Sequence, residues 1–175
     1  SSTAGRITRI ERFSPNGRFL AVRHVSALHF WDLNTATRCL SHEGTNNTFA
    51  FAPHEDAVLL QDRSNEAVFL ELDSGRERFR WSSPLLLPGR RPTGWHTLSF
   101  SPDGRMVAGA SGTSSMVELM NPATGTQLRI LTNYTASATP SHTVAMGWSR
   151  HGGALAVATA DGRIYNWNPD TGERR

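Results

Sequence analysis

Cysteine is represented by Cys39 alone among the 175 residues, and lysine is absent altogether. A single thiol can form neither an internal disulfide nor a cysteine cluster for zinc. No run approaches the roughly 18 apolar residues that a membrane span needs, and residues 1–10 lack the apolar core of a signal peptide. We therefore expect a cytoplasmic protein that does not contact a membrane.

Positive charge is carried by arginine alone, which accounts for all 18 basic residues. Exclusive use of arginine is typical of translation from a GC-rich genome and favours a bacterial source. The formal net charge is only +3, and the arginines are scattered along the chain, which is too little and too diffuse for a nucleic-acid interface. We expect no nucleic-acid partner.

Residue patterns that carry catalysis are also missing. The seven histidines stand singly, no Gly-x-Ser-x-Gly elbow occurs, and no glycine-rich loop leads from a strand into a helix. The sequence therefore predicts a protein that is not an enzyme and that holds no metal and no cofactor.

What the sequence does contain is a repeated turn. FSPNGR at 13–18 returns as FSPDGR at 100–105, and weaker copies begin at Phe51 and Trp148. Proline presets the backbone of the first central turn position, and Asn or Asp followed by Gly accepts the rest of the turn at low cost. Each copy therefore predicts a β-hairpin.

Strand patterns surround each predicted hairpin. An alternating segment such as 95–100 precedes the turn, a short apolar segment such as 106–110 follows it, and a third strand then runs into a second polar turn. No stretch shows a sustained helical period. The sequence predicts an all-β chain of four four-stranded units, at 6–43, 44–82, 95–132 and 142–175, with connecting loops at 83–94 and 133–141.

These units resemble WD40 repeats, which have four strands in about 40 to 45 residues and build β-propellers. Trp31 and Asp32 match the dipeptide that ends the third strand of a WD40 repeat. Thr159, Asp161 and Trp167 match three members of the hydrogen-bonded tetrad that ties WD40 strands together. The resemblance implies structural roles for these five residues within their blades.

The resemblance also implies that the ring is incomplete, because WD40 rings usually close with about seven blades. Four units predict an open arc or a part of a larger propeller, whose exposed end faces would pair with a protein partner, with another domain of the same polypeptide, or with a second copy of the chain. The function that this resemblance implies is a non-enzymatic interaction scaffold or sensor.

An alternative function follows from segment 72–81, which is similar to the blade motif of quinoprotein-like propellers. This similarity implies the non-catalytic or cofactor-holding propeller of an enzyme, a class that includes the gating propellers of peptidases. Both similarities imply the same fold.

Two long connections carry the candidate partner-binding residues. Loops that join one propeller blade to the next emerge on one face, where insertions commonly build a binding surface. Apolar anchors beside arginine suit a protein interface. The residues predicted to bind a partner are Leu86, Arg90, Arg91, Trp95 and Tyr134. The alternative is that both segments are plain connectors.

A further charged pattern occurs in a predicted outermost strand. Alternation places Arg76, Arg78 and Arg80 on one face, with Phe79 and Trp81 on the other. The arginines could dock an anionic partner, or they could protect a sheet edge against pairing with another edge.

Overall fold

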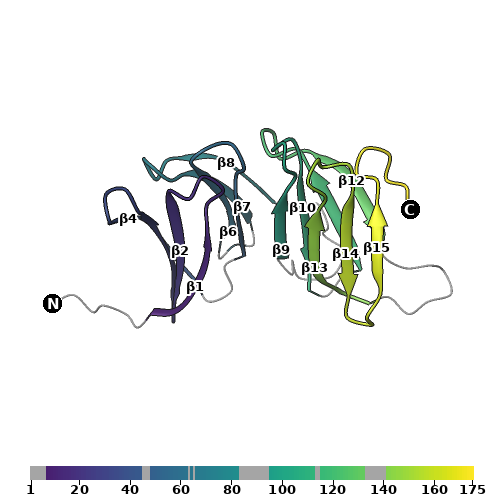
Figure 1. Cartoon of the computed structure of the whole chain (residues 1–175), viewed down its shortest axis with the longest axis horizontal. Coiled ribbons are helices and arrows are strands. Elements are labelled where there is room, and N and C mark those ends of the chain that lie inside the picture. The colour runs from purple at the N-terminus through teal and green to yellow at the C-terminus, as the bar shows by residue number, and fades with distance from the viewer. Residues whose placement is uncertain are drawn as a thin grey trace.

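The computed structural model describes residues 7–44, 48–62, 64, 66–82, 95–112, 115–132 and 141–175. Over these residues the chain forms strands and turns and no helix (Figure 1). None of the described segments therefore provides a helix of the length and apolarity that crossing a membrane requires.

The strands form four antiparallel sheets, and within each sheet the strands lie in chain order. The first blade contains β1 (Ile7–Phe13), β2 (Phe19–His24), β3 (Ala27–Asp32) and β4 (Thr37–Glu43). The second contains β5 (Phe49–Phe51), β6 (Ala57–Gln61), β7 (Glu66–Glu71) and β8 (Glu77–Ser82). The third contains β9 (Trp95–Phe100), β10 (Val107–Ser111), β11 (Met116–Met120) and β12 (Gln127–Thr132).

The fourth blade contains three named strands, which are β13 (Thr143–Trp148), β14 (Leu155–Thr159) and β15 (Ile164–Trp167). An isolated bridge between Trp167 and Arg174 adds the beginning of an outer strand. The all-β propeller fold predicted from the sequence is confirmed.

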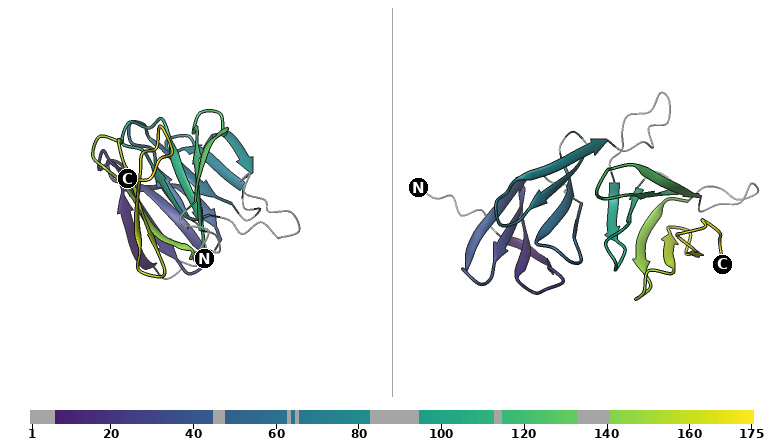
Figure 2. Two further views of the ribbon diagram at one scale, coloured as in Figure 1. Left: turned by 90° about the vertical axis from the view of Figure 1, so that its right-hand side faces the viewer. Right: turned by 90° about the horizontal axis from the view of Figure 1, so that it is seen from above.

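The blades follow one another in an open arc. The innermost strand β9 of the third blade contacts both β5 and β13, the innermost strands of its two neighbours. Seen from above, the sheets fan out in chain order, and the two termini lie at opposite ends of the row (Figure 2). The first and fourth blades therefore each have one neighbour within the chain.

The repeated hairpin is built in the same way in the first and third blades. The Ser14 hydroxyl donates to Asn16 Oδ1 at 2.7 Å and accepts the Phe19 N–H at 2.9 Å. In the third blade the Ser101 hydroxyl donates to Asp103 Oδ1 at 2.6 Å and accepts the Met106 N–H at 2.9 Å. The serine therefore closes the turn from inside, which explains why the motif carries serine before proline.

Glycine is required in these turns by backbone geometry. Gly17, Gly104 and Gly152 have φ angles of 74°, 71° and 73°, and each donates its N–H to the residue three positions earlier. Other residues pay a steric cost in this left-handed region.

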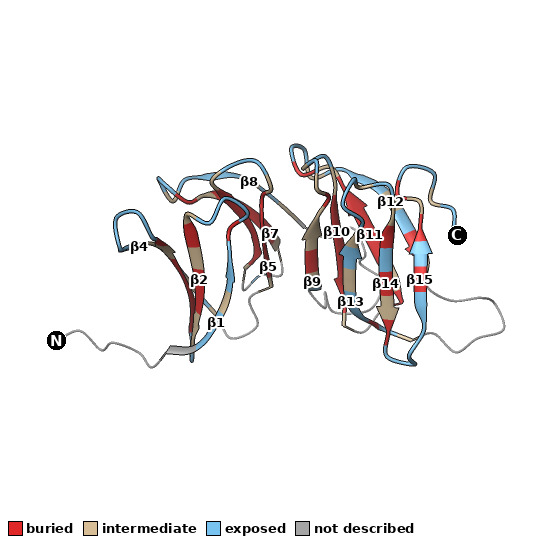
Figure 3. Cartoon of the chain, in the orientation of Figure 1, coloured by how far each residue is buried: buried red, intermediate tan, exposed pale blue. Residues whose placement is uncertain are grey.

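Three apolar cores hold the blades together, one at each boundary. The first joins residues such as Phe30 to residues such as Phe51, the second joins Phe69 to Leu98, and the third joins Leu119 to Trp167. Paired residues of antiparallel strands share a face, so the second and third sheets each present one face to the preceding blade and the other to the following blade. Figure 3 shows the buried residues running along the strands of all four sheets.

Substitution of two adjacent glycines in the first hairpin of the fourth blade tests whether the positive φ angle requires glycine. Gly152→Ala should lower the free energy of unfolding by about 1 to 2 kcal/mol, because alanine is strained at positive φ. Gly153 has no positive φ and no atom within 4 Å of a built Cβ, so Gly153→Ala should be neutral or slightly stabilising. Urea unfolding of both variants is the measurement, and equal losses would contradict the argument.

Candidate interaction surfaces

Most of the predicted partner-binding residues lie outside the described part of the chain. Leu86, Arg90 and Arg91 fall within residues 83–94, and Tyr134 falls within residues 133–140. Their role in binding stays a prediction.

Trp95 is a core residue, and its assignment to a partner-binding surface was wrong. Its side chain is 4% exposed, and its Nε1–H donates to the buried Glu118 Oε2 at 2.8 Å. A Cβ built on Gly109 would lie 2.5 Å from the indole, so the ring also covers a glycine of the neighbouring strand. Trp95 begins β9 and packs inside the second core, where no partner reaches it.

The blade-motif residues occupy structural positions. The Thr159 hydroxyl donates to Asp161 Oδ1 at 2.6 Å, and Trp167 is buried in the third core. The hydrogen bond from the Thr159 hydroxyl lowers the pKa of Asp161 below its usual value. In the first blade Trp31 is half-buried, and the Asp32 carboxylate is buried beside Arg18.

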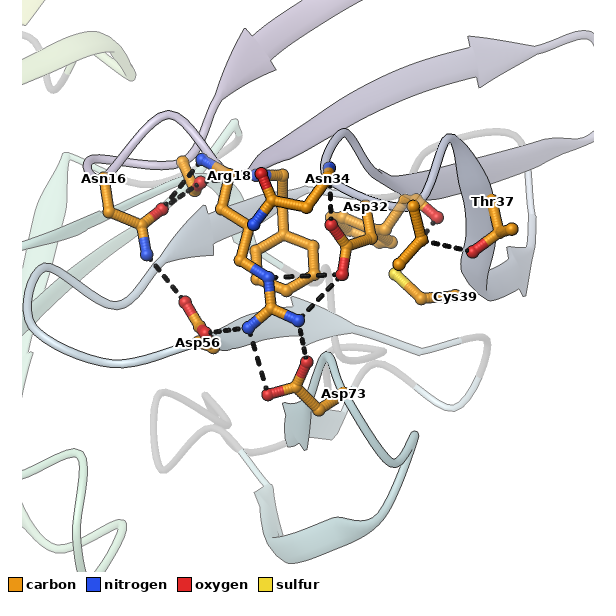
Figure 4. Close-up of polar contacts among 12 residues, drawn as sticks. Asn16, Arg18, Asp32, Asn34, Thr37, Cys39, Asp56 and Asp73 are labelled. Atoms are coloured by element: carbon orange, nitrogen blue, oxygen red, sulfur yellow. Dashed lines mark hydrogen bonds and ion pairs between the residues drawn. The ribbon is translucent and has the colours of Figure 1, made fainter.

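Arg18 joins the first blade to the second through three carboxylates (Figure 4). Its Nη2 lies 2.7 Å from Asp32 within its own blade and 2.5 Å from Asp73 in the second blade, and its Nη1 lies 2.6 Å from Asp56, also in the second blade. The guanidinium carbon lies 4.6 Å from the centroid of the Phe19 ring. The hydrogen bond from Arg18 lowers the pKa of Asp32 below its usual value.

Sequence spacing alone does not predict this cluster. Its members are 14 to 55 positions from Arg18, so only the packing of one blade on the next brings them together. The available signal was the arginine that follows Gly in the hairpin motif together with the aspartate of LDSG at 72–75. We call the Arg18–Asp73 contact the inter-blade latch.

The three arginines of β8 form ion pairs within the second blade. Arg76 pairs with Glu71 and Arg78 with Glu55 and Glu71, while Arg80 pairs with Asp62, Glu66 and Glu77. Phe79 and Trp81 pack on the second core, as the alternation predicted. Because acidic neighbours offset their charge, the arginines favour protection of a sheet edge over an anionic docking strip.

The outward face of the first blade carries exposed apolar side chains. Register places Phe13 beside Leu20 and Leu20 beside Trp31, on the face opposite the first core. Phe13 is 58% exposed, and Ile10 on the same face is 62% exposed. Exposed apolar groups gathered on one sheet face mark a surface that associates.

The outward face of the fourth blade carries small residues. Ala156 and Ala158 occupy the places that Ala108 and Ala110 occupy in the third blade, where both alanines are buried in a core. Ala156 is exposed, and Ile164, the partner of Ala158, is 75% exposed. This face therefore carries the same small residues as a sheet face that packs against a neighbouring blade.

A cleft of about 400 Å³ opens at the boundary between the second and third blades. It lies where three hairpins meet: the first hairpin of the second blade, the first hairpin of the third blade, and the last hairpin of the third blade. Its apolar walls include Pro53, Phe69, Phe79, Phe100 and Pro122, and its charged groups are Glu55, Arg78 and Asp103.

No group of three or more His, Cys, Asp or Glu side chains suited to a metal ion occurs within the described ranges.

Comparison with known proteins gives a match at the level of structure alone. No protein-family model matches the sequence, and no curated protein matches it. The structure is similar to the β-propeller domain of Cps50 (Swd1) from Myceliophteria thermophila, with a TM-score of 0.75 and 18% sequence identity. The match covers 99% of this chain and 55% of that chain, so the present chain spans about half of that propeller domain.

Acid sensitivity tests the ion pairs of the second blade. Hydrogen bonds from Arg76, Ser74 and Arg78 lower the pKa of Glu71 from 4.5 to about 2. Since the folded state holds this carboxylate ionised, its contribution to stability is present above pH 4.5 and is lost as the pH falls toward 2. Glu71→Gln should therefore reduce the urea midpoint at pH 7 and make its decline between pH 5 and pH 2.5 shallower.

Glu173→Gln is the matched control for this measurement, because the Glu173 carboxylate accepts a hydrogen bond from the Thr171 hydroxyl and lies in an exposed turn. Its midpoint should follow that of the unmodified chain at every pH. A Glu71→Gln profile that runs parallel to the unmodified one would show that Glu71 does not contribute to the acid sensitivity.

Proposed function

We propose that this chain is a WD40-type interaction module: a non-enzymatic scaffold or sensor that presents propeller surfaces to a protein partner in the bacterial cytoplasm. The observation that carries the proposal is the apolar outward face of the first blade, with Ile10 and Phe13 both more than half exposed. A face of this kind suits burial against another polypeptide.

The propeller fold supports the proposal because its blades give a rigid array whose loops vary independently of the core. Trp31-Asp32 and the Thr159–Asp161 hydrogen bond support the WD40 type within that fold. The partner is a separate protein, another domain of the same polypeptide, or a second copy of the chain that completes the propeller.

Within this proposal the loop residues Leu86, Arg90, Arg91 and Tyr134 form the contact with the partner. Apolar side chains provide anchors that lose their water on binding. The neighbouring arginines provide bidentate hydrogen-bond donors that select carboxylate or carbonyl groups on the partner. Trp95 is no longer part of this surface, because it supports the adjoining core.

The affinity of a purified partner for the chain tests the proposed loop contact. A partner first identified with the chain as bait is purified, and its affinity is measured by calorimetry. Arg90→Ala with Arg91→Ala should weaken binding at least tenfold, which corresponds to about 1.4 kcal/mol. The charge-matched control is Arg150→Ala with Arg175→Ala, at two exposed positions of the fourth blade.

The control pair should bind like the unmodified chain. Equal affinity of the loop variant would show that the chosen loop residues are not the contact. If no purified protein binds the folded chain, the proposed function fails as a whole.

A further inference from the structure

The three blade boundaries differ in one electrostatic contact. At the first boundary, Arg18 stands five residues after the aromatic that opens the hairpin motif and reaches Asp73 of the next blade. At the third boundary the same two positions hold Arg105 and Asp170. The hydrogen bond to Asp103 is the main cause that raises the pKa of Arg105, and the charge of Asp170 adds a smaller contribution. Arginine and aspartate thus recur across these two boundaries.

The second boundary lacks both members of this pair. The position of the arginine is occupied by Asp56, which turns back to Arg18 of the first blade. The position of the aspartate, two residues before the left-handed glycine of the turn, is occupied by Ala123. Ala123 lines the cleft of about 400 Å³ at this boundary, so the cleft lies where the latch is missing.

The walls of the cleft combine aromatic rings with carboxylates. Phe69 and Phe79 stack with ring centroids 5.1 Å apart, and Phe100 lies 6.1 Å from Phe69. Glu55 from the second blade and Asp103 from the third contribute one carboxylate each, and about two fifths of each side chain is exposed. The same elements, an aromatic face and carboxylates from two blades, surround Arg18 at the first boundary.

Charge favours a cationic occupant. The lining carries two carboxylates and one guanidinium, although the whole chain has a formal charge of +3. The guanidinium is that of Arg78, which is already paired with Glu55 and with Glu71 and lies over the Phe69 ring at 5.5 Å. Asp103 pairs with Arg105, whose side chain is 77% exposed and can be displaced at low cost.

We propose that the cleft between the second and third blades binds an arginine side chain of a partner peptide, which stacks on the half-buried rings of Phe79 and Phe100 and pairs with Glu55 and Asp103. This inference rests on the proposed interaction function and names a second contact for it. Arg18 supplies the cation at the first boundary, and at the second the ligand guanidinium would lie beside Arg78 of the chain itself. The fit follows from guanidinium chemistry, since its flat face stacks on aromatic rings and its edge donates to carboxylates.

Binding of a blocked alanine–arginine–alanine tripeptide tests the site. Titration followed by amide chemical shifts should show saturation with a dissociation constant of roughly 1 to 10 mM, since two partly exposed ion pairs and one stacking contact together give a few kcal/mol. The largest shifts should fall on Glu55, Asp103 and Ala123. The same peptide with citrulline in place of arginine keeps the shape, removes the charge, and should not saturate.

Two charge-removing substitutions locate the contact. Asp103→Asn keeps the turn, because Asn16 makes the same two bonds in the first blade, to Ser14 and to the Arg18 N–H. Combined with Glu55→Gln, it should weaken binding of the arginine peptide at least fivefold, whereas Glu173→Gln should leave it unchanged. Ala123→Trp, at an exposed turn position, retains both acids and should also weaken binding by covering the mouth.

The inference is overturned if the citrulline peptide binds equally well, if the shifts lie elsewhere, or if both the double variant and Ala123→Trp retain full affinity. These outcomes leave the loop contact untouched, because the peptide assay uses neither residues 83–94 nor the natural partner. Conversely, loss of the proposed loop contact would not alter peptide binding in the cleft.

Discussion

Burial of one sheet face against the next is the interaction on which this structure depends. A single four-stranded sheet leaves two faces in water, and each boundary here removes one face of each neighbour from solvent. Phe30, Phe69 and Leu119 lie at corresponding positions in successive blades, and all three are buried in the core that faces the following blade. In the fourth blade the same position holds the exposed Asn166, where the row of cores ends.

Polar contacts differ from one blade boundary to the next, although the apolar cores are alike. Arg18 pairs across the first boundary with two carboxylates of the second blade, whereas the second boundary has Asp56 and Ala123 at the corresponding positions and opens into a cleft. The ion pairs of β8 remain within the second blade, which favours protection of a sheet edge as the role of its arginines. Variation in a few turn residues thus changes the surface between blades without changing the sheets that support it.

The repeated hairpin made the architecture predictable, because turn residues and period-two alternation are local signals. The four-stranded units followed from these signals, whereas the propeller arrangement was implied by the resemblance of the units to WD40 repeats. The Arg18 cluster was not predictable in the same way, since Asp73 and Arg18 meet only after two blades pack. Trp95 was misassigned because it follows a loop rich in arginine and leucine, although it begins the alternating strand that packs on Gly109. The cleft was not predictable from sequence spacing, because the hairpins that line it meet only when the second and third blades pack together.

Sedimentation of the 175-residue chain over micromolar concentrations tests most directly whether an uncovered blade face drives association. The account predicts species heavier than the 19.2 kDa of one chain, in amounts that rise with concentration. Phe13→Glu, on the apolar outward face of the first blade, should shift the equilibrium toward monomer, whereas His151→Glu, at an exposed turn, should not. A strict monomer that binds no apolar dye at any concentration would contradict the account.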